Sequence, residues 1–127
     1  MKNKFVIKVD WTAWQYRDVF DAFYGGCDLE MQAEIDQRLS RLLELGNLAR
    51  EPISKPVEDG IFELRANTVR EHVRLLYYFD PGKRIIFVVA LFKRKKKLPR
   101  KAIEQAKHVR DILRAEKERA SEIGQSH

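Results

Sequence analysis

Residues 60–97 read GIFELRANTVREHVRLLYYFDPGKRIIFVVALFKRKKK, and this stretch decides the fold. Apolar and charged side chains alternate in residues 62–65, and the same two-residue period runs through residues 72–79. This period is typical of β-strands whose two faces meet different surroundings. Residues 85–92 carry no polar side chain on either face, which predicts a strand that is covered on both sides and central in its sheet.

The connections between these strands are equally informative. Residues 80–82 are Asp-Pro-Gly, which predicts a tight turn and an antiparallel hairpin of the second and third strands. Directly after the third strand, residues 93–101 contain seven lysines and arginines and no acidic residue. We therefore expect a rigid strand to position a strongly basic loop.

The N-terminal region predicts one strand and one helix. Apolar residues at positions 5, 7 and 9 indicate an opening strand at an edge of the sheet, where its lysines would discourage pairing with a second molecule. Thr12 and Gln15 have the spacing of a capping box, and aromatic residues then recur at helical spacing up to Gly25. We interpret Trp11 and Trp14, which flank this start, as core residues rather than stacking platforms for nucleobases.

Two longer helices are predicted in the rest of the chain. Asp28 can cap a helix that carries an apolar stripe and ends at Gly46. The following residues, 47–59, are mixed and polar, and predict an irregular connection to the sheet. Pro99 suits the first turn of a last helix with apolar residues on one side, and residues 115–127 predict a fraying end and a loose tail.

These elements predict an α+β fold in a single domain of residues 1–127. The expected sheet is small and largely antiparallel, with an N-terminal strand and three consecutive strands, and it packs against two N-terminal helices and a C-terminal helix. With 44% hydrophobic residues among 127, the chain has enough apolar content for one core. Neither half alone has enough apolar faces to close a core, which argues against a domain boundary in residues 47–59.

Composition also restricts the chemistry. The single cysteine, Cys27, excludes an internal disulfide, and the three histidines lie far apart in the sequence, so we expect no metal site and no cofactor. We interpret Cys27 as unreactive. The longest apolar segment is far too short to cross a bilayer, and no signal-peptide pattern follows Met1. We therefore expect a cytoplasmic protein without a membrane partner.

The charge is distributed unevenly along the chain. Residues 1–60 contain 8 lysines and arginines against 11 acids, whereas residues 61–127 contain 17 against 8. The basic half contains the sheet, and this asymmetry favours a polyanionic partner such as nucleic acid, although an acidic protein partner or a solvated basic surface gives the same count.

A phosphodiester backbone is the ligand that best suits the basic run together with Arg65 and Arg74, two arginines that we expect to be displayed on their strands. His72 is the titrating group nearest to Arg74 in sequence, so it is a candidate proton donor or acceptor, and the alternative is a surface histidine. Glu63 either orients Arg65 through an ion pair or faces water. Cleavage of RNA by its own 2′-hydroxyl would require no metal ion.

Three segments carry a family resemblance: KPVEDGIFELRA, VRLLYYF, and FKRKKKLP with the helix after it. In this order they resemble the RelE/ParE toxin superfamily, most closely its HigB-like branch of phage-derived toxins. The resemblance implies a RelE-like fold, ribosome-dependent cleavage of mRNA, and a helix-turn-helix antitoxin as partner. It places these residues on the family's pattern: Glu63, Leu64, Arg65, Arg74, Lys93, Arg94, Lys97 and Pro99. We interpret Arg65, Arg74, Lys93 and Arg94 as the residues that stabilise the scissile phosphate, and Lys95, Lys96, Lys97, Arg100 and Lys101 as residues that bind mRNA and ribosomal RNA.

The sequence departs from the superfamily at the basic turn. Lys95 and Leu98 stand where threonines are usual, and no tyrosine follows the basic run. Since some members use that tyrosine in catalysis, either His72 or a lysine would transfer the proton here. Two alternatives remain open from sequence: a ParE-like protein that inhibits DNA gyrase by binding it, and an inactive relative that only binds nucleic acid.

Overall fold

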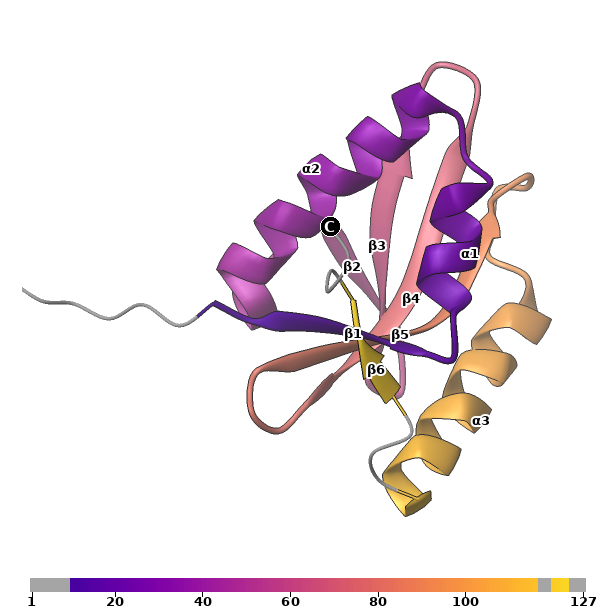
Figure 1. Ribbon diagram of the computed structural model, residues 1–127. Coiled ribbons are helices and arrows are strands. Elements are labelled where there is room, and N and C mark those ends of the chain that lie inside the picture. The colour runs from indigo at the N-terminus through magenta and orange to yellow at the C-terminus, as the bar shows by residue number, and fades with distance from the viewer. Residues whose placement is uncertain (1–9, 117–119, 124–127) are drawn as a thin grey trace, which may run out of the picture.

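The computed structural model describes residues 10–116 and 120–123, and within them it has an α+β fold built on one mixed sheet (Figure 1). The sheet has six strands in the order β2-β3-β4-β5-β1-β6 within this described part of the chain. The strands are β1 (Thr12–Tyr16), β2 (Ser54–Glu58), β3 (Ile61–Asn67), β4 (His72–Asp80), β5 (Arg84–Phe92) and β6 (Ala120–Glu122). The α-helices are α1 (Val19–Gly25), α2 (Leu29–Leu45) and α3 (Arg100–Glu116). This arrangement confirms the predicted fold class.

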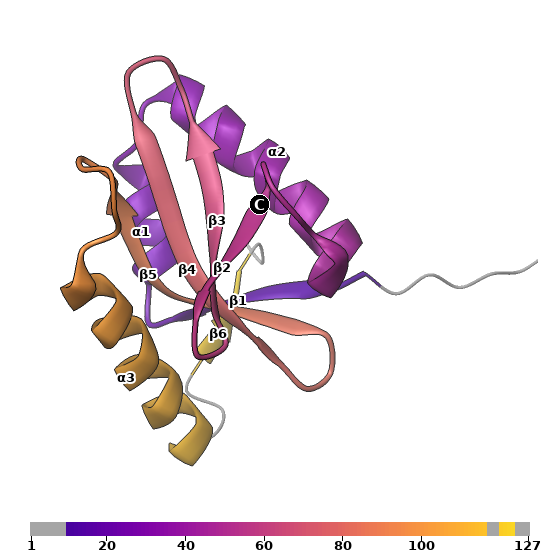
Figure 2. The ribbon, with the colours of Figure 1, turned by 180° about the vertical axis from the view of Figure 1, so that it is seen from behind.

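The helices cover opposite faces of the sheet. α1 and α2 pack on one face and α3 packs on the other, as Figures 1 and 2 show from opposite sides. Met31, Ile35 and Leu42 of α2 are fully buried in the first of two apolar clusters, and Ile103, Ala106 and Val109 of α3 are buried against the other face. Two separate apolar layers therefore hold the sheet between them.

The three consecutive strands and their hairpin are as predicted. β4 pairs antiparallel with both β3 and β5, and β5 lies between β4 and β1, so it is an interior strand. Gly82 and Lys83 have positive φ angles of 83° and 57° in the turn, a conformation that glycine adopts without strain. Arg65 lies directly opposite Arg74 in the β3–β4 register.

The predicted helix start at Thr12 and Gln15 is wrong. Residues 12–16 form strand β1, which pairs parallel with β5. The Gln15 side chain nevertheless caps α1, because its Oε1 accepts hydrogen bonds from the backbone N–H of Phe20 and of Asp21, both at 3.0 Å. The helix ends at Gly25, as predicted. The pattern located the helix correctly but extended it too far toward the N-terminus.

The predicted irregular connection is also partly wrong. Residues 54–58 form β2, which pairs antiparallel with β3 through a tight turn at Asp59 and Gly60, where φ is 50° and 78°. Pro56 is compatible with this strand because β2 lies at an edge of the sheet, where a missing N–H breaks no ladder. The buried Ser54 hydroxyl is hydrogen-bonded to the hydroxyl of Tyr77, which fixes β2 to the interior.

Both predicted long helices are present. Asp28 caps α2, since its Oδ1 accepts a hydrogen bond from the N–H of Met31 at 2.8 Å, and Gly46 follows the last residue of that helix. The Pro99 carbonyl accepts hydrogen bonds from Ala102 and Ile103 at the start of α3.

The predicted loose tail is wrong for residues 120–122, which form β6 on the free side of β1, with Ile123 buried beside them. The predicted opening strand in residues 5–9 lies outside the described residues. No helix in the described ranges combines the length and the apolar character that a bilayer-spanning segment needs.

Candidate nucleic-acid site

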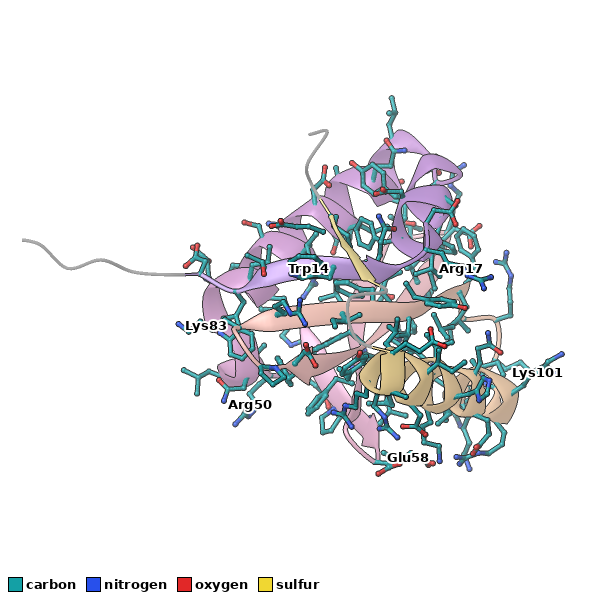
Figure 3. The ribbon with its side chains drawn as sticks, turned by 60° about the horizontal axis from the view of Figure 1, so that its bottom comes forward. Trp14, Arg17, Arg50, Glu58, Lys83 and Lys101 are labelled. Carbon is teal, nitrogen blue, oxygen red and sulfur yellow. The ribbon has the colours of Figure 1, made fainter. Side chains whose placement is uncertain are left out.

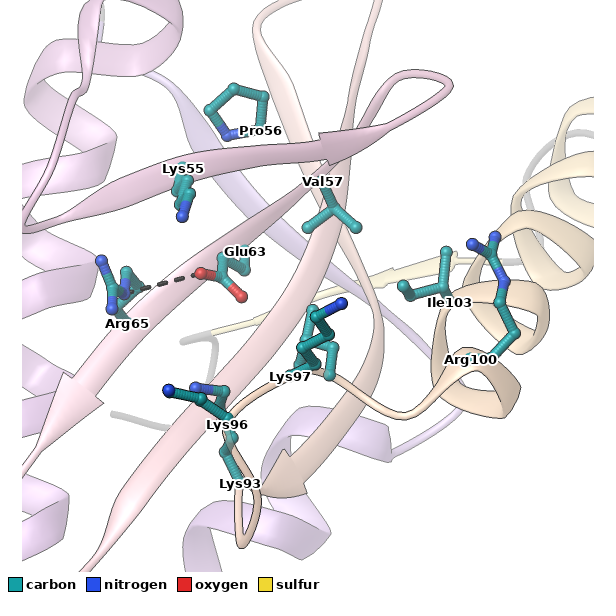
Figure 4. A pocket seen from close by; sticks show the side chains of 11 residues that line it. Lys55, Pro56, Val57, Glu63, Arg65, Lys93, Lys96, Lys97, Arg100 and Ile103 are labelled. Atoms are coloured by element: carbon teal, nitrogen blue, oxygen red, sulfur yellow. Dashed lines mark ion pairs between the residues drawn. The ribbon is translucent and has the colours of Figure 1, made fainter.

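An open cavity of about 510 Å³ lies where the β2–β3 hairpin, the basic loop and the start of α3 meet (Figure 4). It is lined by Lys55, Pro56, Val57, Glu63, Arg65, Lys93, Lys96, Lys97, Leu98, Arg100 and Ile103. Six of these eleven residues are cationic and one is acidic. The cavity thus concentrates positive charge around a single carboxylate, Glu63, among the described residues.

Strand alternation explains why these side chains converge. Glu63 and Arg65 are two residues apart on β3, so both point to the sheet face that α3 also contacts. Lys55 of β2 lies opposite Glu63 and shares this face. Lys93 follows β5 immediately, and its N–H donates a hydrogen bond of 2.7 Å to the carbonyl of His72, which fixes the start of the basic loop beside β4.

Arg74 corrects the prediction that both strand arginines are displayed. The side chain of Arg74 is only 2% exposed, whereas the side chain of Arg65 is 25% exposed. Its Nη1 donates hydrogen bonds of 2.8 Å to Asn67 Oδ1 and to its neighbour's carbonyl at Val73. Burial lowers the pKa of the Arg74 guanidinium, and the nearby carboxylate of Glu63 opposes that effect. Arg74 is absent from the cavity lining and lies beneath it.

Glu63 is placed between the two arginines. Its Oε2 lies 3.5 Å from Arg65 Nε, a pair that Figure 4 marks with a dashed line. Its Oε1 lies 3.8 Å from Arg74 Nε, so one carboxylate neutralises part of both charges. These distances exceed those of ordinary hydrogen bonds. Within the described residues, both Nε atoms are buried without a hydrogen-bond partner. Of the two alternatives that the sequence left open for Glu63, the structure shows the ion pair with Arg65, and it adds a second pairing with Arg74.

Lys93 is a cavity lysine whose surroundings shift its pKa. Burial lowers the pKa of its ammonium group, and the positive charges of Arg74 and Arg65 lower it further. Glu63 opposes this shift. A lysine with a lowered pKa gives up its proton more readily than a free lysine, and Lys93 lies in the cavity lining.

The structure divides the predicted site residues into two groups. The cavity contains Arg65, Lys93, Lys96, Lys97 and Arg100, whereas its lining does not include Arg74, His72, Arg94, Lys95 or Lys101. His72 is exposed at the start of β4. Lys101 projects outward from the first turn of α3, as Figure 3 shows.

Arg94 contacts the body of the protein instead of the cavity. Its Nη1 is 2.8 Å from Glu71 Oε1, and its guanidinium lies over the Phe92 ring at 5.0 Å from the centroid. These contacts hold the first part of the basic loop against the end of the β3–β4 connection. In the structure, Arg94 therefore shapes the loop that carries Lys96 and Lys97.

Arg100 is engaged by two carboxylates at the rim of the cavity. Its guanidinium forms a two-pronged pair with Glu58 of β2 and also contacts Glu104 one turn along α3. Lys107 contacts Glu58 at 2.8 Å, and the hydrogen bonds of Arg100 and Lys107 lower the pKa of Glu58 to about 2. This cluster joins β2 to α3 across the cavity wall.

Sequence reasoning missed Lys55 as a site residue and assigned Glu63 no catalytic or binding role. Lys55 was missed because residues 47–59 were predicted to be irregular, although Asp59-Gly60 is a turn signal that would have revealed the hairpin. In the part of the chain that the structure describes, His, Cys, Asp and Glu side chains do not gather in groups of three that could hold a metal ion.

Comparison with models of protein families assigns the chain to one of them. No curated protein matches the sequence. The family model described as "Phage derived protein Gp49-like (DUF891)" matches residues 24–111, which include α2, the strands from β2 to β5 and most of α3. The match covers well over half of the chain and includes every residue that lines the cavity. The chain therefore belongs to the Gp49-like family of phage-derived proteins, within the RelE/ParE-like toxin superfamily.

Proposed function

We propose that the protein is the toxin of a type II toxin–antitoxin system, of the HigB-like kind, and that it cleaves mRNA on the ribosome. The observation that carries this proposal is the cavity itself: six cationic residues around one carboxylate, at the end of a rigid sheet. A cavity of this charge suits the phosphodiester backbone of RNA. Family membership supports the toxin assignment and implies an antitoxin partner.

Arg65 is the residue best placed to bind the scissile phosphate. Its guanidinium lines the cavity and is held by two carboxylates. Its Nε lies 3.5 Å from Glu63 Oε2, and its Nη1 lies 3.2 Å from Glu51 Oε1. A guanidinium fixed in this way offers a planar fork to phosphate oxygens at little conformational cost. Lys55 and Lys93 add point charges from neighbouring elements, and Arg74 contributes its charge from below without touching the ligand.

Lys93 supplies the proton in the proposed reaction. The 2′-hydroxyl oxygen attacks the adjacent phosphorus, the bond to the 5′-oxygen breaks, and the Lys93 ammonium protonates that leaving oxygen. The products are a 2′,3′-cyclic phosphate and a 5′-hydroxyl end. The lowered pKa of Lys93 favours this role, and His72 lies outside the cavity lining. Fixed cations that meet developing charge contribute about 3–4 kcal/mol each to such reactions.

The remaining cations of the basic loop contact RNA outside the scissile bond. Lys96 and Lys97 line the cavity and are exposed, so they are available to flanking phosphates. Lys95 and Lys101 are exposed beyond the cavity, and we assign them to contacts with ribosomal RNA. We propose further that the partner is a helix-turn-helix antitoxin and that the toxin acts in the cytoplasm.

Primer extension on mRNA from cells that briefly express the protein tests this function. Discrete cuts in translated regions are expected with the wild type and not with Arg65→Ala or Lys93→Ala at equal protein level. Arg41→Ala is the matched control, because Arg41 is an exposed arginine of α2. Growth arrest without cuts would refute the nuclease assignment and favour a ParE-like inhibitor of DNA gyrase. Salt-dependent RNA binding without arrest or cuts would indicate an inactive relative.

A further inference from the structure

Glu63 differs from every other residue in the cavity lining. It is the only carboxylate among the described residues that line the cavity, and it is 6% exposed. Its side chain lies among the cationic groups of β2, β3 and the basic loop (Figure 4). A buried carboxylate costs free energy, and the two flanking arginines offset this cost.

The proposed reaction requires a base as well as an acid. Attack by a 2′-hydroxyl is slow unless a neighbouring group accepts its proton. Arginine and lysine side chains in their ordinary protonated forms are donors only, so the cations of the cavity cannot accept that proton. Among the described residues that line the cavity, Glu63 alone carries an acceptor side chain, because His72 is outside the lining.

We propose that Glu63 is the general base that takes the proton from the attacking 2′-hydroxyl. This inference rests on the proposed function and names the catalytic residue that the sequence resemblance does not assign. The proton moves from the 2′-oxygen to a Glu63 oxygen as the new bond from the 2′-oxygen to phosphorus forms. The bond from phosphorus to the 5′-oxygen then breaks, and that oxygen receives its proton from Lys93, so the charges and atoms balance.

The groups around Glu63 fit this role from each neighbouring element. Arg65 of its own strand and Arg74 of β4 flank the carboxylate, Lys55 of β2 lies opposite it, and Lys93 follows β5. The two arginines approach through Nε, at 3.5 and 3.8 Å, without an ordinary hydrogen bond. They therefore orient the carboxylate electrostatically and leave its oxygens able to accept a proton.

Single-turnover cleavage of a defined mRNA on purified ribosomes tests the inference with three full-length proteins: wild type, Glu63→Gln and Glu63→Asp. Glu63→Gln keeps the shape and removes the basic oxygen, so the cleavage rate is expected to fall about 100-fold to 10,000-fold. The complex with ribosomes should form with equal or higher affinity, because one negative charge leaves a cationic cavity. Glu63→Asp, which keeps the carboxylate, should recover part of the rate.

The pH profile separates a base from a structural residue. Removal of a general base should change how the cleavage rate depends on pH, so Glu63→Gln should give a pH profile that differs from the wild-type profile and should be slower throughout. A Glu63→Gln protein that folds and cleaves at the wild-type rate would overturn the inference. So would one that loses ribosome affinity and cleavage in equal measure with the wild-type pH profile. If wild type makes no cuts, the proposed function itself fails.

Circular dichroism and thermal unfolding of the same proteins establish that each variant is folded. If Glu63→Gln does not fold, Glu63→Asp carries the test alone, because it keeps the charge that pairs with the arginines. A folded Glu63→Asp protein with a reduced rate and unchanged affinity supports the inference, since a shortened base no longer reaches the hydroxyl well. Full activity in Glu63→Asp together with wild-type affinity would contradict the inference, because a general base must reach the 2′-hydroxyl.

Discussion

The two faces of the β3–β4 strand pair are built on different principles. The face toward α1 and α2 is apolar along its whole length, with buried Leu64, Ala66, Val73, Leu75 and Tyr77 in one cluster. The face toward α3 is apolar only at one end, with Ile61, Leu76 and Tyr78. At its other end it carries Glu63, Arg65 and Arg74, and these residues lie in or under the cavity.

This contrast separates stability from activity within one sheet. The apolar face gains free energy from burial without any specific geometry, at about 25 cal/mol per Å². The charged end buries one carboxylate and one guanidinium, which is unfavourable unless they are paired. We infer that the apolar face stabilises the fold sufficiently to hold the charged end in place. The following predictions test this division, from the largest expected effect to the smallest.

Arg74→Ala is expected to be the most destabilising change. It removes a side chain that is 2% exposed and leaves Glu63 buried with one partner fewer, so the free energy of unfolding should fall by about 3–5 kcal/mol. Urea unfolding followed by circular dichroism measures this. The matched control is Arg94→Ala, which breaks an exposed pair and should cost about 0–1 kcal/mol.

The double variant Glu63→Leu/Arg74→Met sharpens the comparison, because it makes the charged end resemble the apolar face. Replacing a buried ion pair with apolar residues of similar size is often neutral or stabilising by about 1–4 kcal/mol. We expect the double variant to be at least as stable as the wild type and to have lost activity. A large loss of stability in the double variant would show that the charged end is itself needed for the fold.

Leu42→Ala tests the apolar face. Leu42 is completely buried between α2 and the sheet, and deleting such a side chain typically costs about 2–5 kcal/mol. The exposed Leu48 provides the control, since Leu48→Ala should change the free energy of unfolding by less than about 0.5 kcal/mol. Equal effects of the two substitutions would contradict the position of the core.

The apolar face was also the part of the molecule that could be predicted from sequence. Two local periods predicted its elements: the alternation in residues 62–65 and 72–79, and the helical stripe that ends at Gly46. The strands and the helix that they predict are present. β1 and β6 were missed for the opposite reason. Their strand character depends on pairing with distant residues, and residues 12–16 also satisfied a helical pattern, so tertiary pairing overrode the local signal.

The site was only partly predictable for a similar reason. Sequence spacing offered an ion pair between Glu63 and Arg65, which are neighbours on one strand face, as one of two alternatives, and the structure shows that pair. Burial of Arg74 could not be read from alternation, because an alternating pattern gives the face of a residue and not the depth at which α3 and the basic loop cover it. Sequence spacing also does not show which contacts a loop residue makes. Arg94 pairs with Glu71, whereas Lys97, three residues later, lines the cavity.

Alkaline pH should weaken both faces. Burial raises the pKa of Tyr77 on the apolar face and of Tyr78 on the α3 face to about 12, from an ordinary value of 10. Because the folded state keeps these protons longer than the unfolded state, their stabilising contribution is complete below pH 10. It is lost as pH rises toward 12, by about 1.4 kcal/mol per pH unit for each tyrosine.

Unfolding in urea at a series of pH values between 9 and 12 measures this effect. Tyr77→Phe and Tyr78→Phe should each reduce the slope by about half, although Tyr77→Phe also removes the hydrogen bond to Ser54 and lowers stability at neutral pH. An unchanged slope in both variants would show that neither hydroxyl is responsible.

The smallest expected effect concerns the Glu58 cluster, which joins β2 to α3 at the cavity rim. Its carboxylate pKa is lowered to about 2 by hydrogen bonds from Arg100 and then Lys107. A lowered pKa stabilises the folded state above the ordinary value of 4.5, and this contribution disappears as pH falls toward 2. The pair is exposed, so Glu58→Gln should change stability only slightly at neutral pH.

Titration of the Glu58 side chain by NMR in wild type and Arg100→Gln tests this cluster directly. In Arg100→Gln the pKa of Glu58 should rise toward 4.5, because the largest cause of its lowering has been removed. If the pKa stays near 2, Lys107 rather than Arg100 holds the carboxylate, and Arg100 is then free to bind RNA at the cavity rim. Arg100 would then count among the RNA-binding residues of the α3 face and not among those that stabilise the fold.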